Sequence, residues 1–293
     1  MYAFFLAPFV DFYFMQNALI GSILLSISAC PIGVFLTLRG MSLTGDAISH
    51  AILPGVAAAF LLCGFSLISM TLGGILAGII VAVATALISR NSFQKEDASM
   101  TVFYLIALAA GVILVSLKKS TIDLLHLLFG SVLALDTQAL WLITTIMLIT
   151  VCSLCIFWRA LVVESVDPLF FKSLSPLSKY VHILLLILVV LNLVGGFQSL
   201  GTLLSVGIMM IPAITARFWL SRLVPICILS IFLGIISSIC GLLLSFHLSL
   251  PSGPAIIIAA GFIYLLSCLI SPRGFIVTWF PYLFYSSSLT LRK

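Results

Sequence analysis

Long apolar runs with very few charges between them constrain this chain more than any other feature. Of its 293 residues, 63% are hydrophobic and 7% are charged, whereas a soluble domain carries about 25% charged residues. A water-exposed surface cannot be built from so few charged side chains. In lipid, a spanning segment must satisfy its own backbone hydrogen bonds, which favours helices of about 20 residues. The sequence therefore predicts an all-α, polytopic membrane protein.

Nine runs are long enough and apolar enough to cross a bilayer. Two pairs of neighbouring runs are separated by a single residue, so eight spans is the alternative count. The whole chain, residues 1–293, is interpreted as one transmembrane domain. Its predicted spans are residues 16–38, 45–65, 67–89, 99–117, 139–158, 180–197, 199–219, 223–246 and 253–271.

The distribution of lysine and arginine predicts the orientation, because short cytoplasmic connections are enriched in these residues. With the N-terminus outside and the C-terminus inside, eleven of the 13 basic residues fall on the inner side. Only Lys118 and Lys119 fall outside. Because removing one span would scramble this partition, the charge bias favours nine spans and an outside N-terminus.

Three segments outside the spans are long enough to have structure of their own. The outer connection, residues 118–138, is predicted to lie as a short helix at the outer surface, where Asp123 and His126 are weaker candidate metal ligands. The inner connection, residues 159–179, contains an Asp-Pro pair that is typical of a helix start, so a short helix is expected there. Residues 272–293 are aromatic and end in basic residues, which is typical of an interfacial tail.

The stretch MSLTGDAISHAILPG, residues 41–55, places an acid and a histidine inside an apolar run. Asp46 and His50 are four residues apart, so their side chains lie on one face of a helix. A carboxylate at the centre of a spanning helix costs about 2.5–3.5 kcal/mol on insertion scales, and the other seven acidic residues lie in loops or near span ends. Pro54 cannot donate a hydrogen bond to the carbonyl of His50, which opens the helix locally.

This polar notch is a candidate site for a divalent cation. Mixed oxygen and nitrogen ligands suit Zn²⁺, Mn²⁺ or Fe²⁺, and the absence of a thiolate argues against Cu⁺. In the alternative interpretation, Asp46 caps the second span and His50 hydrogen-bonds to its carboxylate. The other histidines, His126, His182 and His247, are more readily explained as interface residues.

Several sequence motifs of enzymes are absent. No G-x-x-x-x-G-K-[ST] loop occurs, so ATP-driven transport would need an ATPase on another chain. Neither H-E-x-x-H nor G-x-S-x-G occurs, which argues against an intramembrane protease. The chain is therefore expected to be a transport subunit and not an enzyme, without a permanently bound cofactor.

Four ordered stretches resemble one known family, the permease subunits of bacterial zinc, manganese and iron ABC importers (the ABC-3 family). MSLTGDAISHAILPGVAAAFLL resembles its second-span signature, and GTLLSVGIMMIPAITAR resembles its second signature. SFHLSLPSGPAIIIAAGF resembles its last outer turn and final span, and SVDPLFFKSLSPLSKY resembles its inner loop. The resemblance covers most of residues 15–272.

The resemblance implies a function and a set of partners. It implies a multi-pass permease of the bacterial cytoplasmic membrane, as a homodimer or heterodimer, with two ATPase subunits and an extracytoplasmic metal-binding protein. It implies that Asp46 and His50 line the metal path and that residues 164–178 form the cytoplasmic coupling helix. The candidate coupling residues there are Glu164, Asp167, Pro168, Phe170, Phe171 and Lys172.

Two alternatives from other classes remain. An ion-coupled secondary metal transporter would need no ATPase, but it would need further intramembrane acids for a proton relay. A purely structural membrane subunit would not explain Asp46. The residues alone do not choose among Zn²⁺, Mn²⁺ and Fe²⁺.

Overall fold

Every span predicted from the sequence is helical in the computed structural model, which describes residues 7–64, 66–91, 96–117 and 135–272. Within those ranges there is no strand, and nine segments are long and apolar enough to cross a membrane. The nine-span prediction is therefore confirmed. The helices are α2 (Ala7–Asp11), α3 (Tyr13–Leu38), α4 (Thr44–Ala51), α5 (Leu53–Cys63), α6 (Leu67–Asn91), α7 (Glu96–Leu117), α9 (Thr137–Val166), α10 (Pro168–Leu174), α11 (Leu177–Leu200), α12 (Thr202–Trp219), α13 (Leu223–Leu248) and α14 (Ser252–Ile270).

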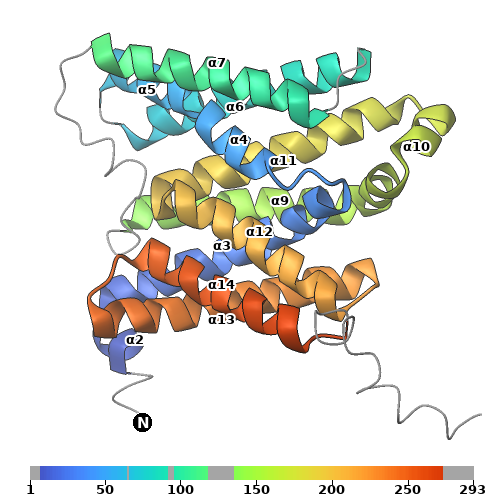
Figure 1. Cartoon of the computed structure of the whole chain (residues 1–293). Helices are drawn as coiled ribbons and strands as arrows, with labels where there is room; N and C mark the ends of the chain where they lie inside the picture. Colours follow the sequence, from blue (N-terminus) through green and yellow to red (C-terminus); the bar gives the residue numbers. More distant parts are fainter. Residues whose placement is uncertain (1–6, 65, 92–95, 118–134, 273–293) are drawn as a thin grey trace, which may run out of the picture.

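Helices α3 and α11 form the centre of the bundle. Of the apolar window of each, 72% of the residues are buried, against 22% for α7 and α9. Figure 1 shows α5, α6 and α7 along one side and α13 and α14 along the other, with α3, α9, α11 and α12 between them. The peripheral helices keep exposed leucine and isoleucine side chains, as expected where lipid is the solvent.

The second span is divided into two helices. Helix α4 ends at Ala51 and α5 begins at Leu53, with Ile52 between them. Pro54 occupies the first turn of α5, where its missing N–H costs nothing. The division follows His50 by two residues, but the backbone stays hydrogen-bonded through it: the Ile52 amide donates to the Ile48 carbonyl oxygen at 3.1 Å, and the Val56 amide donates to the Ile52 carbonyl oxygen at 3.2 Å.

Two glycines allow α5 and α6 to cross at close range. A Cβ atom on Gly55 would lie 2.0 Å from the carbonyl oxygen of Gly73, and a Cβ atom on Gly73 would lie 2.3 Å from that of Gly55. No side chain fits in either place, and small residues are the usual means of close helix packing in lipid. This crossing fixes α5 against α6, only three residues after Ile52.

The predicted inner helix is present, but it is shorter than the segment assigned to it. Asp167 is its N-cap: its Oδ1 accepts a hydrogen bond from the Phe170 amide at 2.9 Å, and Pro168 is the first helical residue. Helix α9 continues to Val166, so Glu164 belongs to α9 and not to the connection. The expected span of residues 139–158 was too short at this end.

Polar contacts gather several helix ends at one end of the bundle, called the α10 end here. It comprises the last residues of α3, α9 and α12, the first residues of α7 and α11, and α10. For example, Arg217 Nη1 donates to the Thr37 carbonyl oxygen at 2.8 Å, which ties the end of α12 to the end of α3. The sequence assigned all of these segments to the inner side. Asp123, His126 and residues 273–293 lie outside the described residues.

Gly73→Val should destabilise the protein by about 1–3 kcal/mol, because the added side chain overpacks the α5–α6 crossing. The measurement is the thermal unfolding midpoint of the purified protein in detergent. Gly261→Val is the matched control, since no atom lies within 4 Å of a Cβ built on Gly261. Equal midpoints for the two variants would contradict the close crossing.

The charge distribution predicts that the α10 end is cytoplasmic. Thr137 and Ser221 are exposed residues at opposite ends of the bundle, so a cysteine at each reports one side in a background without the 7 native cysteines. A membrane-impermeant maleimide should label Thr137→Cys in intact cells and Ser221→Cys only after permeabilisation. Labelling of Ser221→Cys in intact cells would invert the orientation.

Candidate functional site

Asp46 lies in the first turn of α4 and points away from its own bundle. Its side chain is 67% exposed. A carboxylate in this position is stabilised by the helix dipole. Leu43, and not Asp46, is the N-cap residue, and no side-chain hydrogen bond caps the helix. The capping interpretation of Asp46 therefore has no support in this geometry.

His50 faces Asp46 from the next turn of the same helix. Its Nε2 atom lies 3.7 Å from Asp46 Oδ1, and its side chain is 34% exposed. This distance is too long for a hydrogen bond, so the two groups face one another without a direct bond. On its other side, the His50 ring lies 6.3 Å, centroid to centroid, from the ring of Tyr104 on α7.

The spacing of these two atoms fits a shared metal ion. Nitrogen and oxygen ligands lie about 2.0–2.2 Å from a transition-metal ion, so two ligand atoms of one ion are at most about 4.4 Å apart. The 3.7 Å between Nε2 and Oδ1 is inside this limit. The separation of the two atoms is thus compatible with both of them binding one ion.

The described residues place no third His, Cys, Asp or Glu ligand at the Asp46–His50 pair. Across the part of the chain that the structure describes, no group of three or more His, Cys, Asp or Glu side chains could hold a metal. A metal ion bound at the Asp46–His50 pair would therefore need further ligands from outside this set of described His, Cys, Asp and Glu side chains, such as water. Such an open site suits an ion that has to leave again.

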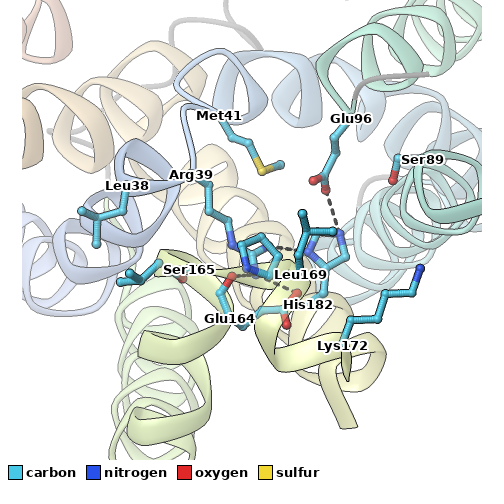
Figure 2. Close-up of a pocket in the computed structure, with 12 residues that line it drawn as sticks. Leu38, Arg39, Met41, Ser89, Glu96, Glu164, Ser165, Leu169, Lys172 and His182 are labelled. Carbon is cyan, nitrogen blue, oxygen red and sulfur yellow. Dashed lines mark hydrogen bonds and ion pairs between the residues drawn. The ribbon is translucent and has the colours of Figure 1, made fainter. Parts of the chain in front are cut away.

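A second set of polar residues, which the sequence analysis did not connect, lies at the α10 end. Glu164 Oε1 is 3.3 Å from Arg39 Nη2, and Glu164 Oε2 accepts a hydrogen bond from Ser178 at 2.7 Å. Arg39 also hydrogen-bonds to His182 Nδ1, and His182 Nε2 is 2.7 Å from Glu96 Oε1. These five residues are called the Arg39 network, and Figure 2 shows most of them around a cavity of about 680 Å³.

Only weak sequence signals pointed to the Arg39 network. Its members lie at span ends, where charged residues are common. Most residues that contact one another in the network are far apart in the sequence. The sequence predicts His182 to be an interface residue, but it is only 3% exposed. It also predicts Glu164 to belong to the coupling segment, but Glu164 is 0% exposed. The burial of these two side chains, which the sequence does not reveal, distinguishes them from ordinary residues at span ends.

Helix α10 projects from this end with apolar side chains exposed. Leu169 is 80% exposed and Phe170 is 54% exposed, and Leu174 at the end of the helix is 64% exposed. Phe171 instead packs against the chain's own core. The two phenylalanines expected to act together therefore face different surroundings, and only Phe170 is available to another protein.

Comparisons with known proteins agree on one family. The model of the ABC 3 transport family matches residues 11–271. The manganese import system permease protein ScaB of Streptococcus parasanguinis is 37% identical over 272 residues, which cover 92% of this chain and 96% of the relative. The probable iron transport system membrane protein of Haemophilus influenzae is 32% identical over 249 residues, which cover 85% of this chain and 90% of the relative.

A solved structure agrees with the fold. The structure of PsaBC from Streptococcus pneumoniae in complex with Fab is similar to this chain with a TM-score of 0.82 and 35% sequence identity. The alignment covers 95% of this chain and 99% of the chain compared. The similarity thus extends over nearly the whole bundle and is not confined to a few helices.

Proposed function

The chain belongs to the ABC 3 transport family, and we propose that it is the permease of an ATP-driven importer of Mn²⁺. It is a multi-pass protein of the bacterial cytoplasmic membrane and a transport subunit, not an enzyme. The observation that carries the proposal is the Asp46–His50 pair, set 3.7 Å apart on an exposed face of the divided second span. Family membership disfavours the ion-coupled secondary transporter.

Manganese is the substrate that chemistry and similarity support together. Carboxylate and water ligands suit Mn²⁺, and one imidazole adds a nitrogen ligand that separates transition metals from Ca²⁺ and Mg²⁺. ScaB, described above, is a manganese import permease, and the Haemophilus relative is named for iron. Fe²⁺ is therefore the second candidate. Zn²⁺ accepts the same ligands but has no support from these relatives.

The metal pathway is completed by a second permease copy or a homologous permease. Asp46 is exposed toward the outside of its own bundle, and no third ligand from the described residues approaches the pair. A second permease facing α4 would enclose the ion between two bundles and contribute groups from its own surface. Water would occupy the positions that remain, so the ion would be held without being trapped.

A separate ATPase supplies the energy, since the sequence has no phosphate-binding loop. The exposed apolar face of α10, with Leu169, Phe170 and Leu174, is its docking surface on this chain. Two copies of the ATPase would match two permeases. An extracytoplasmic metal-binding protein would deliver the ion at the opposite end of the bundle from α10.

Asp46→Asn and His50→Ala should each lower Mn²⁺ uptake by at least about 10–100-fold, a loss that even outer partners of metal ligands can cause. The measurement is Mn²⁺ accumulation in cells that lack the native permease, beside immunodetection of the variant. His50→Ala should also reduce discrimination against Ca²⁺, because the remaining ligands are all oxygens. Asp11→Asn, another exposed carboxylate, is the matched control. Normal uptake by either site variant would remove that residue from the pathway.

Phe170→Asp should weaken ATPase binding by at least about 30-fold, the equivalent of the 2 kcal/mol of an interface hot spot. The permease itself should stay folded, because Phe170 is exposed. Phe171→Asp should instead lower the unfolding temperature, since Phe171 packs against the core. Ser221→Asp adds the same charge on another connection and is the control. Undiminished co-purification of the ATPase with Phe170→Asp would exclude α10 as the docking helix.

A further inference from the structure

Glu164 is a buried carboxylate that the transport site does not use. It is fully buried near the end of α9, and its two oxygens have different partners: Arg39 at 3.3 Å and the Ser178 hydroxyl at 2.7 Å. Removing a charge from water is costly unless it is paired and hydrogen-bonded. Both oxygens of Glu164 meet that condition, so this geometry is strongly favoured over any in which Glu164 and Arg39 separate.

The network continues from Arg39 to α7 through His182. A guanidinium group can only donate hydrogen bonds, so His182 Nδ1 must accept from Arg39. His182 Nε2 lies 2.7 Å from Glu96 Oε1, a contact at ion-pair distance that lacks hydrogen-bond geometry. The polar contacts thus run from Arg39 through His182 to Glu96, and Figure 2 shows the three groups in succession beside the cavity.

The network joins the helix that faces the ATPase to the helix that bears the metal pair. Glu164 lies three residues before Asp167, the N-cap of α10. Arg39 is the C-cap of α3 and lies seven residues before Asp46, just ahead of the turn into α4. Glu96 is the first residue of α7, the helix whose Tyr104 lies beside His50. Each end of the network therefore lies within a few turns of a functional element.

A cavity lies beside the Arg39 network, between α10 and the end of α3. Leu169 and Lys172 of α10 line one part of it, and Leu38 at the end of α3 and Met41 in the α3–α4 turn line another. Helix α10 itself packs on α9 and α11. Glu164 and Arg39 are bonded to one another at the edge of this cavity.

We propose that the Arg39 network is a positioning link that transmits ATP-driven displacement of α10 to α4 and so changes access to the metal pair. Charge-assisted hydrogen bonds are short and directional, so displacement of Glu164 pulls Arg39 and the α3–α4 turn with it. Apolar surfaces would slide past one another instead. The proposal rests on the proposed function, since α10 must dock an ATPase.

The test is whether ATP still changes the environment of the α3–α4 turn when the network is broken. Leu43, in that turn, is 76% exposed, so Leu43→Cys in a cysteine-free background reports the turn through its rate of thiol modification. The rate is measured in the full permease–ATPase complex with and without ATP. This readout does not depend on which metal is transported.

The ATP response is compared among two network variants and one control. Glu164→Gln removes the charge and keeps a side chain of the same length. The double variant Arg39→Met with Glu164→Met removes both charges together, and such replacement of a buried ion pair is often neutral for folding. Asp97→Asn makes the same acid-to-amide change on an exposed residue adjacent to Glu96 and is the control.

Both network variants should assemble with the ATPase and hydrolyse ATP. The ATP-dependent change at Leu43→Cys should fall by at least about 5-fold, and Mn²⁺ import per ATP should fall by about tenfold, within the usual range of coupling between sites. Asp97→Asn should match the parent protein. If only Glu164→Gln fails to assemble with the ATPase, the ATP response of the double variant decides the test.

The proposal is overturned if an assembled network variant keeps the parental ATP response at Leu43→Cys. It is also overturned if import and hydrolysis fall together with an unchanged ratio, or if both variants lose assembly, because the network would then only hold the fold. No ATP response in the parent complex would overturn it as well. An ATP response without Mn²⁺ import would refute the proposed substrate alone and leave the link supported.

Discussion

The cost of keeping a carboxylate away from water organises this molecule. In a chain with only eight acidic residues, each acid near the apolar bundle must find a partner or remain exposed. Glu164 is fully buried and is held by Arg39 and Ser178 from two other parts of the chain. Asp46 is largely exposed and faces His50 at a distance too long for a hydrogen bond. Glu164 therefore has its partners within the chain, whereas Asp46 is available to bind a metal ion in the proposed pathway.

This difference explains how one bundle combines stability with transport. The central helices α3 and α11 have the largest buried share of the described spans, and the Arg39 network joins their ends to α7 and α9. The metal pair lies instead on a short helix that is separated from α5 at Ile52. Helix α4 packs against α6, α7, α11 and α12, and the next helix, α5, is held against α6 through the Gly55–Gly73 crossing. The Arg39 network and the proposed metal pair are thus held by different contacts.

Much of the fold was predictable because lipid leaves few choices. The need for about 20 apolar residues located all nine spans, and the Asp167-Pro168 pair located α10. The i,i+4 spacing correctly placed Asp46 and His50 on one face. The end of α9 was missed because Glu164 resembles a loop residue until its partner is known, and Arg39 is 125 residues away. The His182–Glu96 contact was hidden for the same reason, since sequence spacing predicts neighbours on one helix but not partners on two.

In the proposed pathway, Mn²⁺ passes through a site made by the carboxylate of Asp46 and the imidazole of His50. Pulsed electron paramagnetic resonance of Mn²⁺ bound to the purified permease–ATPase complex, without the extracytoplasmic binding protein, tests it most directly. A bound imidazole couples its nitrogen nucleus to the electron spin of the metal. The account predicts a nitrogen coupling in the parent complex that is lost in His50→Ala and retained in His247→Ala. Bound Mn²⁺ without nitrogen coupling, or coupling that survives in His50→Ala, would contradict it.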